Sequence, residues 1–133
     1  MEDQRFTLLK TSMEKAYAPY SKFKVGAIVL GNNGKYYTGC NVENAAYPQG
    51  CCAEASAISA MIMDGETVIR EVCVIGSGDV LVTPCGGCRQ RIREFAGDET
   101  PIQIWGPEGL KKIFTLGELL PASFGPDNLD KIK

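Results

Sequence analysis

Three cysteines and one glutamate carry the most chemical information in this sequence of 133 residues. Cys52-Ala53-Glu54 is followed, further along the chain, by Pro84-Cys85-Gly86-Gly87-Cys88. Thiolates are favoured ligands of Zn²⁺, and three protein ligands leave the fourth tetrahedral position open for water, as in catalytic zinc sites. A carboxylate beside the first ligand is the group that such a water needs as a proton acceptor. The pattern predicts a zinc site suited to hydrolysis, with Cys52, Cys85 and Cys88 as ligands and Glu54 as the acid–base group.

Two other interpretations of the cysteines stay open. A fourth cysteine (Cys40, Cys51 or Cys73) could close the coordination shell and make the zinc structural, although such sites usually pair two closely spaced motifs and only one Cys-x-x-Cys is present. The cysteines could instead be small buried residues, which explains neither their spacing nor Glu54. Disulfides are disfavoured because a chain of this length needs no such cross-links.

The net charge of a three-cysteine site requires compensation. Three thiolates on one Zn²⁺ leave a negative charge and make a bound water a weaker acid. Arg89 directly follows Cys88. We expect its guanidinium to turn toward the thiolates and to offset their charge from just outside the ligands, together with the positive ends of two helices.

Both halves of the pattern fall where a loop enters a helix. We predict a helix rich in small residues at 52–64, which ends at Gly65, and a second helix at 85–96. Helix N-termini stabilise thiolates. Two helices that begin at one point would therefore bring the three sulfur atoms together.

The remaining elements predict the scaffold. Asp3 caps a first helix that ends before Ala18-Pro19. Strands are expected at 23–30, 35–39, 72–75, 102–105 and 112–116, with Asn32-Asn33-Gly34 as a hairpin turn. A helical turn at 117–120 precedes a polar tail. Strands separated by helices indicate crossovers onto one sheet. We predict a single α/β domain over residues 1–133, a three-layer α-β-α sandwich with a mixed five-stranded sheet.

Composition excludes several classes of protein. The chain is 44% hydrophobic and 23% charged, which is ordinary for a globular protein. Its net charge of -2 does not indicate the basic surface that nucleic-acid binding requires. The N-terminus lacks the pattern of a secretory signal, and no apolar stretch approaches the eighteen or so residues that span a bilayer. No histidine is present. We expect a cytoplasmic protein with reduced thiols and neither a nucleic-acid nor a membrane partner.

Over nearly its whole length the chain resembles the zinc-dependent cytidine deaminases, in particular the small homotetrameric form of nucleoside salvage. Asn41-Val42-Glu43-Asn44 narrows the resemblance to enzymes of free nucleosides. The other matching segments are 17–23 (YAPYSKF), 25–27 (VGA), 39–47 (GCNVENAAY), 52–54 (CAE), 84–90 (PCGGCRQ) and 118–121 (ELLP).

The resemblance implies hydrolysis of cytidine and 2′-deoxycytidine to uridine and 2′-deoxyuridine with release of ammonia, in pyrimidine salvage. It implies one Zn²⁺ per subunit, with Glu54 as the proton shuttle. Phe23 would pack against the pyrimidine, and Asn41 and Glu43 would bond the ribose hydroxyls, an interaction that strongly selects for hydroxylated ligands. It further implies a homotetramer in which neighbouring subunits complete each pocket. The other expected substrate-binding residues are Val42, Ala53 (through its amide), Ala46, Tyr47 and Phe124, and the carbonyl of Thr83 is an alternative contact for the base.

One position departs from the pattern of the resemblance. Many relatives carry an arginine directly after the catalytic glutamate, where this chain has Ala55. Without that arginine, Arg89 becomes the more important candidate for the positive charge near the thiolates.

Three other functions stay open. The chain could be a deaminase of single-stranded nucleic acid, which needs a basic groove with stacking aromatics. It could be a deaminase of another cytosine derivative, such as a nucleoside antibiotic, or a non-catalytic module stabilised by zinc.

Overall fold

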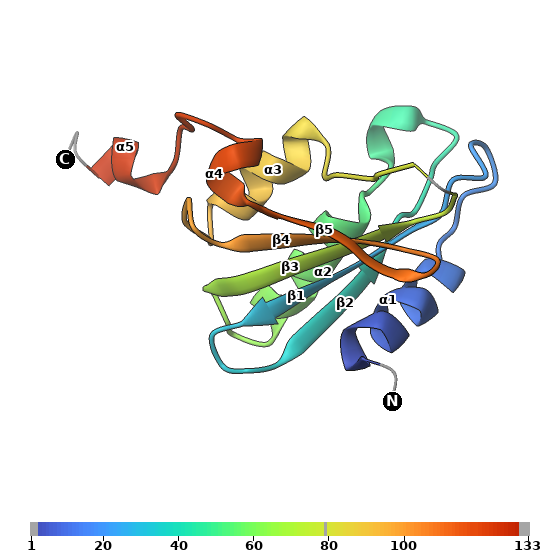
Figure 1. Ribbon diagram of the computed structural model, residues 1–133. Coiled ribbons are helices and arrows are strands. Elements are labelled where there is room, and N and C mark those ends of the chain that lie inside the picture. The colour runs from blue at the N-terminus through green and yellow to red at the C-terminus, as the bar shows by residue number, and fades with distance from the viewer. Residues whose placement is uncertain (1–2, 79, 131–133) are drawn as a thin grey trace.

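Five strands form one sheet in the order β2-β1-β3-β4-β5 in the computed structural model, which describes residues 3–78 and 80–130 (Figure 1). Strands β3 and β4 are parallel, and every other neighbouring pair is antiparallel. The predicted mixed five-stranded sheet is therefore confirmed. The strands are β1 (Val25–Gly31), β2 (Tyr36–Cys40), β3 (Ile69–Gly76), β4 (Pro101–Gly106) and β5 (Gly109–Thr115).

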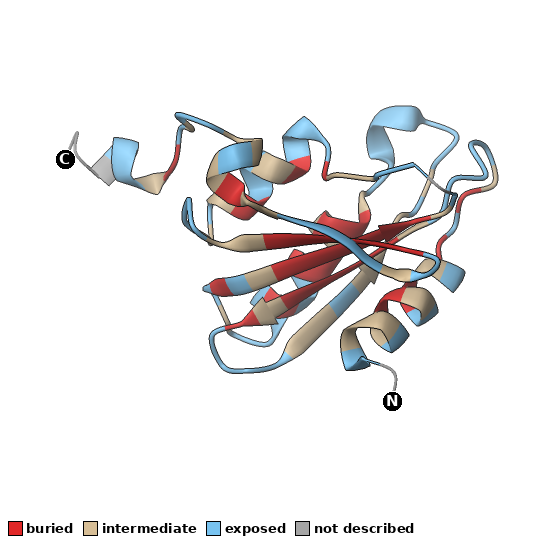
Figure 2. Cartoon of the chain, in the orientation of Figure 1, coloured by how far each residue is buried: buried red, intermediate tan, exposed pale blue. Residues whose placement is uncertain are grey.

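Helices cover both faces of the sheet. Helix α1 (Gln4–Glu14) packs on one face, where Leu9 contacts a cluster that includes Cys73 and Ile75 of β3. Helices α2 (Ala53–Met63) and α3 (Gly86–Arg93) lie on the other face, against a cluster that includes Val72 and Val74. Successive strand residues point to opposite faces, so a strand buried on both sides is a continuous apolar run. The buried sheet thus forms the middle of three layers, as predicted (Figure 2).

Some element boundaries differ from the prediction. Helix α1 ends at Glu14, earlier than expected, and the chain then runs beside Val42, to which Tyr17 forms a parallel bridge. Strand β3 begins at Ile69, three residues before the predicted start, because its pairing with β1 continues that far. Two short helices follow β5, namely α4 (Leu116–Leu119), which was expected as a helical turn, and α5 (Pro126–Asp130), which was not predicted.

Gly39 sets the position of α2 on the sheet. A Cβ atom at Gly39 would lie 2.5 Å from the backbone nitrogen of Ala57 and would overlap the carbonyl oxygen of Ala53. A side chain at this position would therefore push away the first turns of α2. Because Cys52 is the N-cap of α2, this close approach also determines where the first predicted ligand lies.

In the part of the chain that the structure describes, no helix is both long and apolar enough to cross a membrane.

Candidate zinc and nucleoside site

The starts of α2 and α3 bring the three predicted ligands together. Cys52 is the N-cap of α2, Cys85 is the N-cap of α3, and Cys88 lies in the first turn of α3. Their Sγ atoms all lie within 4.8 Å of one another, and those of Cys52 and Cys85 are 3.9 Å apart. Tetrahedral coordination with Zn–S bonds of about 2.3 Å separates the sulfur atoms by about 3.8 Å. The three thiols therefore fit around a single Zn²⁺.

The other cysteines lie outside this group. Cys73 is buried in the sheet, where its thiol contacts Oε1 of Gln103 at 3.4 Å. The thiol of Cys51 lies 3.5 Å from the carbonyl oxygen of Cys52. Among the described residues, the histidine, cysteine and carboxylate groups that could share a metal ion are Cys52, Cys85 and Cys88 alone. The arrangement therefore supports an open zinc site rather than a closed four-cysteine site.

The environment of the thiols makes metal binding a proton-releasing step. Burial raises the pKa of Cys52, and burial together with the charge of Glu54 raises the pKa of Cys88. Burial also disfavours the thiolate of Cys85, but its contacts with Cys88 and Cys52 outweigh that effect and lower its pKa. A metal ion must displace the thiol protons, so its affinity for this site depends on pH.

Glu54 is a buried carboxyl group in the first turn of α2. Its side chain is only 4% exposed. Burial raises the pKa of Glu54, while contact with the Cys88 thiol and the positive charge of Arg91 act in the opposite direction. A carboxyl group with a raised pKa beside a metal site is suited to accept a proton and to return it.

Arg89 does not contact the thiols, contrary to our expectation. Its Nε donates to the carbonyl oxygen of Pro84 at 2.7 Å, and Nη1 donates to that of Leu119 at 2.7 Å. Nη2 donates to Oγ1 of Thr83 at 3.1 Å. Arg89 therefore ties the loop that precedes Cys85 to Leu119 at the end of α4. The guanidinium that reaches a thiol belongs to Arg91, whose Nη1 lies 3.7 Å from Sγ of Cys88.

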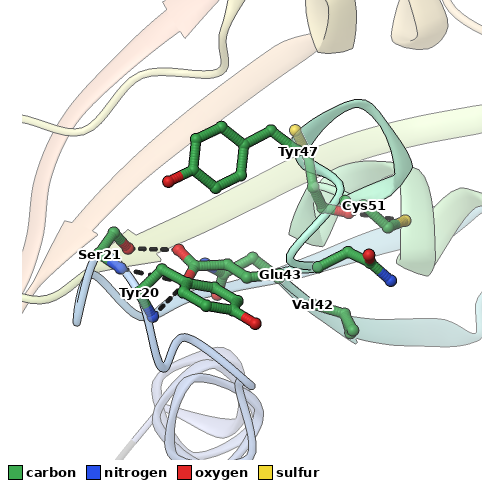
Figure 3. Close-up of a pocket in the computed structure, with 10 residues that line it drawn as sticks. Tyr20, Ser21, Val42, Glu43, Tyr47 and Cys51 are labelled. Carbon is green, nitrogen blue, oxygen red and sulfur yellow. Dashed lines mark hydrogen bonds between the residues drawn. The ribbon is translucent and has the colours of Figure 1, made fainter.

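A pocket of about 490 Å³ opens beside the cysteines (Figure 3). Four of the predicted substrate-binding residues line it, namely Asn41, Val42, Glu43 and Tyr47. The ring of Tyr47 lies across the pocket from Glu43 (Figure 3). It forms an edge-to-face pair with Tyr20, with 6.4 Å between the ring centroids. The remaining lining residues are Tyr20, Ser21, Asn44, Gly50, Cys51 and Cys52. Cys52 thus connects the pocket to the candidate zinc site.

The polar side chains of the pocket are held in defined orientations. Glu43 accepts hydrogen bonds from the backbone amides of Tyr20 at 2.9 Å and Ser21 at 3.1 Å, and from the Ser21 hydroxyl. These bonds, led by the Ser21 hydroxyl, hold the pKa of Glu43 below its usual range. Oδ1 of Asn41 accepts from the amide of Val25 at 2.8 Å, and its Nδ2 donates to the carbonyl oxygen of Phe23 at 2.9 Å. Each side chain keeps further hydrogen-bonding capacity for a ligand.

The other four predicted substrate-binding residues do not line this pocket. Phe23 is 40% exposed just before β1, Ala46 is exposed, and Ala53 is buried at the start of α2. Phe124 is 56% exposed, and its carbonyl oxygen accepts a hydrogen bond from Gln90 Nε2 at 2.8 Å, which ties it to α3. Within one chain, the structure does not bring these four residues to the pocket.

The residues of the site that sequence reasoning missed include Arg91, Tyr20 and Ser21. Arg91 had a signal, because it lies three residues after Cys88 and therefore on the same side of α3. Tyr20 and Ser21 had no local signal for their role. Their contact with Glu43 spans more than twenty residues of sequence and depends on the bridge between Tyr17 and Val42.

Comparison with known proteins agrees with this geometry. Residues 1–103 match the family model described as the cytidine and deoxycytidylate deaminase zinc-binding region. The cytidine deaminase of Sporosarcina psychrophila is 39% identical over 120 residues, which cover 90% of this chain and 88% of the relative. A cytidine deaminase of Mycobacterium tuberculosis is 43% identical over 117 residues, covering 87% of this chain and 84% of the relative.

Comparison of the fold with solved structures points to the same family. The crystal structure of cytidine deaminase from Burkholderia pseudomallei superposes with a TM-score of 0.85 at 36% identity, covering 93% of this chain and all of the other. The match of the zinc-binding region includes the three thiols and the buried carboxyl group described above. On the sequence match, the shared fold and the zinc-binding region together, this chain belongs to the cytidine deaminase family.

Proposed function

We propose that this chain is a zinc-dependent cytidine deaminase that converts cytidine and 2′-deoxycytidine to uridine and 2′-deoxyuridine and releases ammonia. The observation that carries the proposal is the position of Glu54, which is buried against Cys88 beside a cluster of three thiols. Three thiol ligands would leave the fourth position of a Zn²⁺ ion for water. The relatives named above, which match along most of their length, are cytidine deaminases. A role in pyrimidine salvage follows from this reaction.

Cys52, Cys85 and Cys88 would hold the Zn²⁺, which when bound makes water a stronger acid and hence a nucleophile near neutral pH. Glu54 accepts a proton from the attacking water. It delivers this proton to the ring nitrogen beside the attacked carbon. Glu54 then accepts the second proton of the attacking water, from the hydroxyl group now on that carbon, and delivers it to the exocyclic amine. The carbon–nitrogen bond breaks, the amine leaves as ammonia, and the hydroxyl oxygen becomes the carbonyl oxygen of the product. The burial of Glu54 favours each return of the proton, because the charged form of a buried carboxyl group is disfavoured.

Asn41 and Glu43 would bind the ribose. Both line the pocket that begins at Cys52, and both are oriented by hydrogen bonds within the chain. A site with fixed polar groups discriminates strongly against ligands that lack the matching hydroxyl, since those groups then stay unpaired. Phe23, Val42 and the amide of Ala53 would contact the base or sugar. This part of the proposal rests on resemblance, and for Val42 also on its position in the pocket.

The proposed function is tested by an absorbance assay on cytidine and 2′-deoxycytidine, with metal analysis of the same preparation. We expect about one Zn²⁺ per chain, turnover of both nucleosides, loss of turnover with a chelator and recovery with Zn²⁺. Zinc binding without deamination of any pyrimidine nucleoside would contradict the proposal and would favour a non-catalytic zinc module. Turnover of an oligonucleotide with none of cytidine would favour a nucleic-acid deaminase.

We further propose that the chain forms homotetramers in which neighbouring subunits complete each pocket. Tyr47 is 78% exposed, and Phe124 is exposed and lies outside the pocket of its own chain. Large exposed aromatic residues are typical of interface anchors. Ala46, which is also exposed, and Phe124 would reach the pocket of a neighbour.

Subunit mixing tests the shared pocket. Glu54→Gln and Phe124→Ala homo-oligomers are each expected to be impaired. If Phe124 acts on a neighbouring subunit, mixed oligomers contain some pockets with both native residues, so mixing should restore part of the activity. Light scattering gives the mass of the assembly. A monomer with full activity would exclude the shared pocket.

A further inference from the structure

The three arginines of α3 have different partners. Arg89 donates to the carbonyl oxygens of Pro84 and Leu119, as described above. Arg93 donates from Nε to Oγ of Ser123 at 2.9 Å and pairs with Asp127. Arg91 lies between them in sequence, and its guanidinium lies 3.7 Å from Sγ of Cys88.

The backbone of α3 allows this contact. Side chains of a helix lean toward its N-terminus, so Arg91 covers the turn that contains Cys88. Gly87 lies beneath the guanidinium, and a Cβ atom there would be 3.2 Å from Nη1 of Arg91. The absence of a side chain at Gly87 therefore leaves room for the guanidinium to lie back toward the thiols.

The cluster requires a positive charge. Three thiolates on one Zn²⁺ leave a negative charge, and the Glu54 carboxyl group lies next to Cys88. Ala55, in the first turn of α2, contributes none. The guanidinium of Arg91 lies 3.7 Å from Sγ of Cys88, and the three Sγ atoms lie within 4.8 Å of one another, so its positive charge acts on all three thiols.

We propose that Arg91 is a positioning residue of the zinc site, whose guanidinium stabilises the Cys88 thiolate and thereby the binding of the metal by all three thiols. The inference rests on the zinc site of the proposed function. Metal binding converts neutral thiols to a cluster with net negative charge, so a fixed cation beside them favours the bound state. The same cation withdraws electron density from the sulfur of Cys88.

The test compares Arg91→Gln, Arg91→Lys and the control Arg70→Gln, which removes one arginine charge from an exposed position of β3. Zinc affinity is measured by competition with a chromophoric chelator. Loss of a group that supports a metal ligand typically weakens binding 10–100-fold, and we expect about tenfold for Arg91→Gln because the side chain is exposed. Arg91→Lys should retain most of the affinity, and Arg70→Gln all of it.

Substitution of Co²⁺ for Zn²⁺ provides a readout that a merely structural role would not change. Thiolate-to-Co²⁺ charge-transfer bands should move to longer wavelength in Arg91→Gln, because the sulfur regains electron density, and should stay in place in Arg70→Gln. Adding Ala55→Arg to Arg91→Gln should restore affinity, since residue 55 follows Cys52 by three positions, as Arg91 follows Cys88. Circular dichroism checks the fold of each variant.

An Arg91→Gln protein that matches Arg70→Gln in both affinity and band position would overturn the inference and leave the proposed function intact. A wild-type protein that holds no Zn²⁺ would overturn both. The two failures are therefore distinguishable.

Discussion

The Sγ atoms of Cys52 and Cys85 lie 3.9 Å apart, although 33 positions separate the two residues in sequence. Each is the N-cap residue of its helix, and neither side chain forms a capping hydrogen bond. The two thiols therefore lie side by side where the two helices begin. This relationship underlies the following predictions, because it makes the start of α2 and the start of α3 one site.

Replacing Cys85 should abolish zinc binding, whereas replacing Cys51 should not. Cys85→Ala removes one of three sulfur ligands and leaves the rest with too few protein ligands for a stable site. Cys51→Ala is the matched control, because Cys51 adjoins a ligand in sequence but lies outside the three-thiol group. Metal analysis after dialysis distinguishes them. Loss of zinc from Cys51→Ala would show that a fourth cysteine closes the site.

Glu54→Gln should keep its zinc and lose turnover. The amide has nearly the shape of the carboxyl group and cannot carry protons, and a general acid–base group contributes about 10²–10⁴-fold. We expect a loss of at least this size in kcat, with KM changed far less. The measurements are steady-state kinetics on cytidine and metal content. Turnover close to that of the wild type would exclude Glu54 as the proton shuttle.

Ser21→Ala should weaken nucleoside binding and change its pH dependence. Hydrogen bonds from Ser21 hold the pKa of Glu43 below its usual range, so the carboxylate persists at lower pH than that of an ordinary glutamate, whose pKa is about 4.3. Without the hydroxyl, the pKa of Glu43 rises. On acidification, KM should therefore begin to increase at a higher pH in the variant.

At pH 7 we expect KM of Ser21→Ala to increase about fivefold, because Glu43 loses one orienting hydrogen bond. Ser59→Ala, at an exposed position of α2, serves as the control. KM and kcat are measured from about pH 4 to about pH 7, a range that includes the usual glutamate pKa. If KM depends on pH in the same way in Ser21→Ala and Ser59→Ala, Glu43 does not take part in substrate binding.

Gly39→Ala should destabilise the fold and displace the site. The added methyl group would meet the backbone of α2 at 2.5 Å from the Ala57 nitrogen, and such overpacking typically costs about 1–3 kcal/mol. At Gly97 a Cβ atom would have nothing within 4 Å, so Gly97→Ala should change the free energy of unfolding by less than about 0.5 kcal/mol. Urea denaturation measures both. Equal midpoints would contradict the close packing of β2 and α2.

The sequence by itself determined the chemistry and much of the scaffold. The spacing of Cys85 and Cys88 and the adjacency of Cys52 and Glu54 predict the open zinc site, because ligand type and helical spacing are local properties. The buried strands were evident for the same reason, since apolar runs such as 72–75 (VCVI) reflect burial on both faces of the sheet. The exact ends of the strands were not evident from the sequence, because the strand that pairs with them determines where each one begins.

Only the tertiary structure decided which side chains act on the site. Arg89 and Arg91 are equally plausible neighbours of Cys88 in sequence, yet carbonyl oxygens of Pro84 and Leu119 bind one of them and leave the other for the thiol. The orientation of Glu43 likewise depends on Ser21, which a distant bridge brings to it. Hydrogen-bond partners that are far apart in the chain meet only after folding, so they cannot be predicted from residue spacing alone.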